Sequence, residues 1–333
     1  MTDTPKTLEF SVASEKSTLA HYRREWTPSA SVSLGGIWHG AVVSDEKGNQ
    51  YWGIRGTDDF VSGMTHVVSP LCGFRSLDNG FDGQPAHLFD EYSGIDWFEP
   101  MTYTVSDDLV HTGFPSGRIE RDQDGLHWYD ASGRWEIHGR TVSDVVLTRV
   151  PVQPGIDHEV YYRHELLYAT GQINGVAVSG YAHQDYAYGP SGMIYTELPI
   201  ARQLQGMWVS WLHQYGDGEL GGGSFWQGRD ERPFGPGYRV QDGLTVTHED
   251  VLATPAFDGA GKMVTLDVQM GSQSYSFAFD TIGSPVHYFG SLVESSGGRE
   301  PLRSWCWVEH AGPMMTPEIL DIFNGQYQLA RGR

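Results

Sequence analysis

The sequence has 333 residues and a mass of 37.0 kDa, with 22 basic and 42 acidic side chains, so its formal net charge is −20 at pH 7. This acidic balance makes nucleic acid and anionic membranes unfavourable partners, and we expect neither. With 11 Trp, 17 Tyr and 14 Phe and only 19% charged residues, the chain has ample apolar surface for a folded core, which excludes a disordered protein.

Short strands joined by tight turns are predicted along most of the chain. Turn signals occur, in chain order, at residues 45–49, 130–133, 174–175, 242–243 and 271–272. Asn174-Gly175 tolerates the positive φ angles that a two-residue type I′ hairpin needs, and it separates two strand-like segments. Residues 264–270 carry apolar side chains at every second position, as a half-buried strand requires, and residues 275–280 repeat this pattern. The two segments therefore predict a hairpin.

A single helix is predicted, at residues 316–325, with Thr316 as N-cap, Pro317 at the first helical position and Gly325 at the end. Strand-like sequence stops near Pro190-Ser191-Gly192 and restarts at residue 207. We therefore expect an all-β protein with few short helices, formed by two antiparallel β-barrels packed side by side. The expected domains are residues 1–192 and 193–333, each long enough for one closed barrel.

Sequence signatures of several common site types are missing. The chain has no phosphate-binding loop, no dinucleotide fingerprint opening a helix and no nucleophile elbow, and its 14 histidines show no clear metal-ligand spacing. We expect neither a cofactor nor a metal. Cys72 and Cys306 are too few for a disulfide framework, and the sequence shows no signal peptide or membrane-spanning segment, so a cytoplasmic location is expected.

Residues 180–189 concentrate an imidazole, a carboxyl group and three phenols at the end of a predicted strand. On a strand, His183 and Asp185 share one face, while Tyr186 and Tyr188 lie on the other. A carboxyl group beside aromatic walls can be desolvated and can then donate a proton near neutral pH. The alternative is a surface strand with solvated polar residues and packed tyrosines.

Three sequence blocks resemble a known family. Gly180 with Asp185-Tyr186-Ala187-Tyr188-Gly189, then residues 206–218, and finally residues 305–312 are similar, in order and spacing, to blocks of the carotenoid 1,2-hydratase (hydroxyneurosporene synthase) and AttH-like family. The resemblance implies two lipocalin-like (calycin) barrels with an apolar cavity near their junction. The family's His-Glu-Trp is Tyr186-Ala187-Tyr188 in this chain, so two of its ionisable positions are changed and only Asp185 is kept.

The resemblance implies a cofactor-free hydratase or dehydratase that acts by acid catalysis on a hydrophobic terpenoid, steroid-like or phenolic molecule. The expected catalytic residues are Asp185 as the acid, His183 or Tyr186 assisting it, and Glu309 as a second carboxyl group that positions water. The expected substrate-binding residues are aromatic: Tyr188, Trp208, Trp211, Trp307 and Trp38.

Two other functions remain open at this point. One is a non-catalytic carrier of apolar small molecules, which would bind a ligand without forming a product. The other is an isomerase or cyclase that holds a polyene in a reactive shape, as lipocalin-like Diels–Alderases do, and tolerates loss of Asp185. In each case the expected partner is a hydrophobic small molecule. The sequence does not give the oligomeric state.

Overall fold

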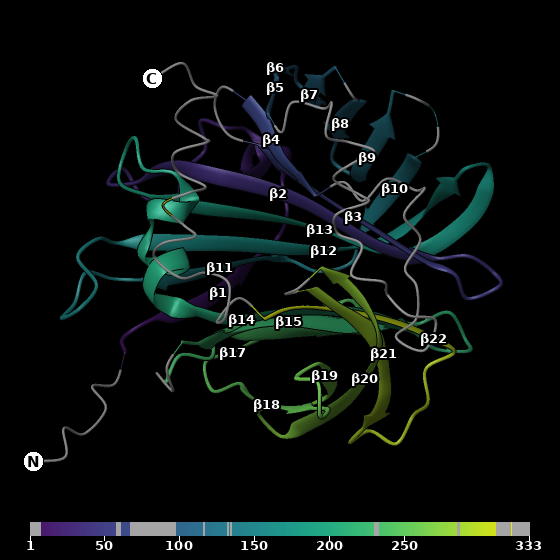
Figure 1. The fold of residues 1–333 in the computed structure, drawn as a ribbon. Coiled ribbons are helices and arrows are strands. Elements are labelled where there is room, and N and C mark those ends of the chain that lie inside the picture. The colour runs from purple at the N-terminus through teal and green to yellow at the C-terminus, as the bar shows by residue number, and fades with distance from the viewer. Residues whose placement is uncertain are drawn as a thin grey trace, which may run out of the picture.

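The computed structural model describes residues 8–57, 61–66, 98–115, 117–131, 133, 135–229, 233–284, 287–310 and 321, and gives the backbone alone for 61–66, 98–99 and 280–284. Its strands pair into two curled antiparallel sheets (Figure 1). This confirms the predicted all-β class with two lipocalin-like barrels. Of the helix predicted at residues 316–325, the structure describes Asp321 alone, in helical conformation.

The first sheet follows the order β5-β4-β3-β2-β13-β12-β10-β9-β8-β7-β6, and β11 joins it by pairing with both β1 and β12. Its strands are β1 (Ser11–Glu15), β2 (Ser33–Ser44), β3 (Gln50–Thr57), β4 (Val61–His66), β5 (Phe98–Pro100), β6 (Thr102–Val105), β7 (Val110–Phe114), β8 (Gly117–Arg121), β9 (Gly125–Asp130), β10 (Trp135–Thr141), β11 (Val145–Val150), β12 (Val160–Ile173) and β13 (Val176–Gly189). A 3-10 turn, η1 (Leu19–Tyr22), precedes β2.

The second sheet has the order β17-β16-β15-β14-β22-β21-β20-β19-β18. Its strands are β14 (Gln205–Gln214), β15 (Leu220–Gly228), β16 (Gly237–Gln241), β17 (Leu244–His248), β18 (Leu252–Phe257), β19 (Met263–Met270), β20 (Gln273–Ser284), β21 (His287–Ser295) and β22 (Arg303–Glu309). Two short helical turns, η3 (Tyr195–Glu197) and η4 (Ile200–Leu204), connect the sheets. The last strand of the first sheet thus ends at Gly189, and the second sheet begins at Gln205.

The predicted hairpin turns are confirmed. Asn174 and Gly175 have φ angles of 52° and 77°, and Asp242 and Gly243 have φ angles of 55° and 70°, as type I′ turns require. The turn between β12 and β13 pairs Ile173 with Val176 and fixes the register of both long strands. The hairpin expected from residues 264–270 and 275–280 is formed by β19 and β20.

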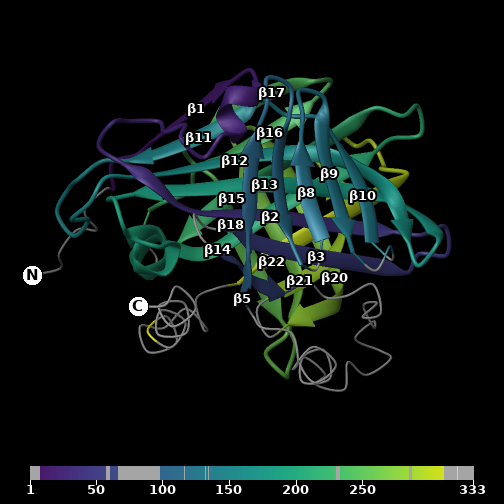
Figure 2. The same cartoon turned by 90° about the horizontal axis from the view of Figure 1, so that it is seen from above.

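The two sheets pack face to face, with β12 and β13 of the first lying against β14 and β15 of the second (Figures 1 and 2). The apolar cluster between them contains Trp52, Leu166, Trp208 and Trp307. The Tyr181 hydroxyl donates to the carbonyl of Ser210 across this contact at 3.0 Å. Separate apolar clusters fill the interior of each sheet. The contact between the sheets therefore has an apolar core of its own, separate from these three clusters.

Candidate active site at the contact between the two sheets

Asp185 lies on the face of β13 that meets the second sheet. It is directly opposite Trp38 of β2 and His164 of β12, and it is 8% exposed. His183 shares this face, because side chains two positions apart on a strand point the same way. A buried polar group without a hydrogen-bond partner costs free energy. The partners of the two Asp185 carboxyl oxygens are therefore important.

Tyr162 links Asp185 to the second sheet. The Trp208 indole Nε1 donates to the Tyr162 hydroxyl at 2.8 Å, and this hydroxyl donates to Asp185 Oδ2 at 2.6 Å. The directions are fixed because an indole nitrogen can only donate. Burial, and next the Asp185 charge, raise the pKa of Tyr162 well above its ordinary value, so the phenol stays protonated. Asp185 Oδ2 is consequently held as an acceptor.

His183 stands among aromatic rings beside the other carboxylate oxygen. Its Nδ1 lies 3.5 Å from Asp185 Oδ1, and its ring centroid lies 4.9 Å from that of Trp208 and 5.3 Å from that of Trp307. The ring also stacks on His164 at 5.5 Å with an interplanar angle of 16°. Both sheets therefore contribute to the surroundings of this imidazole.

Gly40 of β2 faces His183 directly, and a Cβ atom there would overlap the imidazole nitrogen Nε2. We predict that Gly40→Ala lowers stability by about 1–3 kcal/mol, because the buried ring has to move within a packed core. Urea unfolding measures this effect. Gly216→Ala is the matched control, since a Cβ at Gly216 meets nothing within 4 Å. Equal midpoints for the two variants would show that the ring is not held at this position.

Glu309, at the end of β22, brings a second carboxyl group to the site. It lies directly opposite Trp208 on the neighbouring strand and retains partial solvent exposure. Desolvation in the surrounding protein, and next the negative charge of Asp185, raise the pKa of Glu309 to about 7. Glu309 can therefore hold a proton close to neutral pH.

The segment that connects the two sheets, together with the start of β14, adds Tyr195 and Gln205 to the site. The Tyr195 hydroxyl donates to Gln205 Oε1, and the Gln205 side chain also hydrogen-bonds Glu309. The Tyr195 ring packs edge-on against Trp38, with centroids 4.5 Å apart. Burial and the charges of Glu309 and Asp185 raise the pKa of Tyr195 well above its ordinary value. The site is thus built from both sheets and from the segment that joins them.

A small cavity adjoins Tyr162, and Asp185 is not among the residues that line it. Its volume is about 20 Å³, and it is lined in part by Tyr162, His164, Ser224 and Tyr238. A cavity of this size holds about one water molecule when polar groups surround it. His164 Nδ1 lies 2.6 Å from the Tyr238 hydroxyl, and burial lowers the pKa of His164 well below its ordinary value, so this imidazole is neutral. The larger apolar cavity predicted beside Asp185 stays a prediction.

The structure brings together many of the side chains predicted from the sequence, but not all of them. Those at the contact between the sheets are Asp185, His183, Glu309, Trp38, Trp208 and Trp307. Tyr186 and Tyr188 point into the first sheet's interior, where the Arg163 guanidinium lies 3.6 Å from the Tyr186 ring centroid. Trp211 packs inside the second sheet, 5.2 Å from the ring of Tyr275.

Sequence reasoning missed Tyr162, Tyr195 and Gln205. A signal existed for Tyr162, because the Asn174-Gly175 turn fixes the pairing of β12 with β13 and so places Tyr162 diagonally across from Asp185. No comparable pattern marks Tyr195 or Gln205, which come from the connection and the first position of β14. Within the described part of the chain, no three His, Cys, Asp or Glu side chains are grouped to hold a metal ion.

The fold and the site together define an all-β protein with two lipocalin-like sheets and, where they meet, a pair of carboxyl groups, of which Asp185 is buried and Glu309 partly exposed. No family model and no curated protein matches the chain. Among solved structures, it is similar to a protein named AttH from Nitrosomonas europaea, with 11% identity, a TM-score of 0.38, and coverage of 83% of this chain and 92% of that one.

Two further solved structures are similar to the chain. Kievitone hydratase from Nectria haematococca has 8% identity and a TM-score of 0.29 over 83% of this chain and 88% of that one. CghA has 12% identity and a TM-score of 0.38 over 90% of this chain and 97% of that one. Within the described residues, no helix is both long and apolar enough to cross a membrane.

Proposed function

We propose that the protein adds water to, or removes water from, a hydrophobic terpenoid, steroid-like or phenolic molecule by acid–base catalysis. The observation that carries this proposal is the pair Asp185 and Glu309, one carboxyl group from each sheet, which interact electrostatically among aromatic rings. Paired carboxyl groups in different states of protonation can act as acid and base in one reaction. Hydration and dehydration of this kind need only proton transfer and water, so we propose no cofactor.

In the hydration direction, Glu309 gives its proton to one carbon of an alkene, and a C–H bond forms. The adjacent carbon becomes cationic, and the faces of Trp208 and Trp307 stabilise this charge. Water adds to the cation to form the C–O bond, and Asp185 accepts the proton that the water loses. Transfer of that proton back to Glu309 restores the starting state. Dehydration follows the same steps in reverse.

This assignment exchanges the roles expected from the sequence, where Asp185 was the acid. Glu309 suits the acid role because its raised pKa, about 7, keeps it protonated up to neutral pH. Asp185 suits the base role because its Oδ2 accepts the Tyr162 hydroxyl and Oδ1 has His183 Nδ1 at 3.5 Å. Tyr162 and His183 then position the base rather than transfer the proton themselves.

The protonation state of Glu309, the proposed acid, determines how the rate of hydration depends on pH. Hydration requires protonated Glu309, so we predict that kcat falls tenfold per pH unit once the pH exceeds about 7, the raised pKa of this group. Glu309→Gln carries no titrating proton and is predicted to remove this limb and to lower kcat by about 10²–10⁴-fold. A pH–rate profile of both proteins measures this. A wild-type rate that is flat from pH 6 to about pH 9 would contradict the assignment of Glu309.

The function itself is tested with a panel of isoprenoid alkenes, their tertiary alcohols and prenylated phenols. Each probe is incubated with the protein, and mass spectrometry looks for the gain or loss of one water, while quenching of tryptophan fluorescence reports binding. A product differing by one water supports the proposal. Binding with no product favours a carrier, and a product of unchanged mass favours an isomerase or cyclase.

A further inference from the structure

A second site lies at the edge of the contact between the sheets, on a different part of the surface from Glu309. It is a groove of about 530 Å³, which is within the range of small-molecule sites. Its walls come from the segment before η1 and the end of β10 in the first sheet, and from the turns before β15 and β17 in the second. Both sheets are therefore needed to form it.

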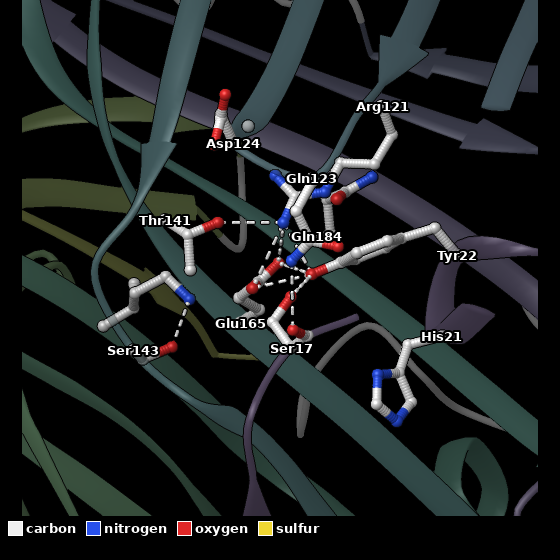
Figure 3. Close-up of polar contacts among 12 residues, drawn as sticks. Ser17, His21, Tyr22, Arg121, Gln123, Asp124, Thr141, Ser143, Glu165 and Gln184 are labelled. Carbon is white, nitrogen blue, oxygen red and sulfur yellow. Dashed lines mark hydrogen bonds and ion pairs between the residues drawn. The ribbon is translucent and has the colours of Figure 1, made fainter. Parts of the chain in front are cut away.

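Two residues that line the groove are also the ends of a buried chain of hydrogen bonds, which Figure 3 shows. The carboxylate of Glu165 accepts the Tyr22 hydroxyl at 2.7 Å and the Arg121 guanidinium at 3.0 Å, and both charged side chains are 2% exposed. The Tyr22 hydroxyl also contacts Ser17 Oγ, and Arg121 Nη2 donates to Thr141 Oγ1 at 2.9 Å. Ser17 and Thr141, the two ends of the chain, line the groove.

The donor and acceptor roles within this chain determine which hydrogen bonds Ser17 and Thr141, at its two ends, can still form with a ligand. Tyr22 gives its single proton to Glu165, so Ser17 has to donate to Tyr22, and the lone pairs of Ser17 are left as acceptors. Thr141 accepts from Arg121, so its own O–H is left to donate. Burial and the Glu165 carboxylate raise the pKa of Tyr22, which keeps this order of donors in place. The inner wall thus presents one fixed acceptor and one fixed donor.

The rim of the groove is polar but close to neutral. Lys16 pairs with Asp144 at 2.7 Å. The Glu219 carboxylate pairs with Arg299, and Arg140 supplies a positive charge that balances the carboxyl group of Asp242. Because positive and negative charges at the rim balance, the groove favours neither an anionic nor a cationic ligand. Leu220 and Val240 add apolar surface to the same groove.

We propose that this groove binds a neutral polyhydroxylated molecule, either a free sugar or the sugar portion of a glycoside. A hydroxyl group donates and accepts at once, which matches the fixed acceptor at Ser17 and the fixed donor at Thr141. Carboxyl and guanidinium groups at the rim can each bond two neighbouring hydroxyls, and the apolar wall fits the C–H face of a sugar ring. This site is independent of the proposed hydration reaction.

Saturation-transfer NMR with the full-length protein tests the proposal. The probes are glucose, mannose and galactose, together with methyl α-glucoside, methyl α-mannoside and methyl β-galactoside, with benzoate and choline as charged comparisons. We expect transfer to at least one sugar and weaker transfer to both charged probes. Thr141→Val removes the donor with little change of shape, and is expected to weaken the Kd of that sugar by about two- to tenfold. A free sugar and the sugar portion of a glycoside are distinguished by comparing the titration of each free sugar with that of its methyl glycoside.

Two further variants keep the test decisive. Thr104→Val, on the exposed side of β6, makes the same change away from the groove and is expected to leave the Kd unchanged. Arg140→Met changes an exposed rim residue, so it tests the groove even if Thr141→Val fails to fold. The proposal is overturned if no sugar shows saturation transfer at millimolar concentration, or if neither Thr141→Val nor Arg140→Met weakens binding more than Thr104→Val does.

Discussion

Asp185→Asn is expected to lower kcat for hydration by about 10²–10⁴-fold, which is the contribution of one positioned acid or base. Asparagine fills the same space, and its amide oxygen can still accept the Tyr162 hydroxyl, which lies 2.6 Å from Asp185 Oδ2. The change therefore removes the base and leaves the contact between the sheets in place. Steady-state kinetics on the substrate found in the probe panel measures the effect, and KM is expected to change much less than kcat.

The matched control is Asp267→Asn. Asp267 is an exposed strand residue of β19 whose carboxylate accepts the Ser276 hydroxyl at 2.6 Å, so it makes a similar contact far from the site. Its variant is expected to retain wild-type kcat. If Asp185→Asn also retained it, Asp185 would have no catalytic role, and the assignment of the base to this residue would be wrong.

Glu165→Gln is expected to destabilise the protein by about 3–5 kcal/mol, the cost of removing one partner of a buried ion pair. Glu165 and Arg121 are each 2% exposed, and their charged groups lie 3.0 Å apart. Without the carboxylate, the Arg121 charge stays buried opposite a neutral amide. Urea unfolding of the variant and the wild-type protein gives the difference.

Glu159→Gln provides the comparison, because Glu159 pairs with Arg149, whose side chain is 50% exposed. Water already solvates much of that pair, so its loss is expected to cost about 1 kcal/mol or less. A loss of less than 1 kcal/mol for Glu165→Gln would mean that the Arg121 charge finds another partner, and the hydrogen-bonded chain behind the groove would then need revision.

Local patterns predicted the strands and turns well, because their causes lie within a few residues. The positive φ angles at Asn174 and Asp242 follow from the turn dipeptides alone. Period-two alternation placed His183 and Asp185 on one face of β13 and Tyr186 on the other, as the structure has them. The same rule, applied to β14, would have separated Trp208 from Trp211, which lie on opposite faces.

Pairings between distant strands account for what the sequence could not predict. The pKa of Glu309 is raised because the pairing of β22 with β14 brings its carboxyl group into a desolvated place at the contact between the sheets and, next in importance, near the charge of Asp185. The Glu165–Arg121 pair joins β12 to β8, and Tyr22 reaches it from a turn that is far from both in the chain. No periodicity within one segment encodes such contacts, because each depends on how whole sheets curl and pack.

The most direct test of the central claim is the origin of the oxygen atom in the product. The reaction is run in the hydration direction, in water enriched in heavy oxygen, with wild-type protein, Asp185→Asn and Glu309→Gln, and mass spectrometry follows the hydrated product. Our account predicts one labelled oxygen per product molecule with the wild-type protein, and almost no labelled product with either variant. An unlabelled product of unchanged composition, or labelling that is equal in all three proteins, would contradict water addition at Asp185 and Glu309.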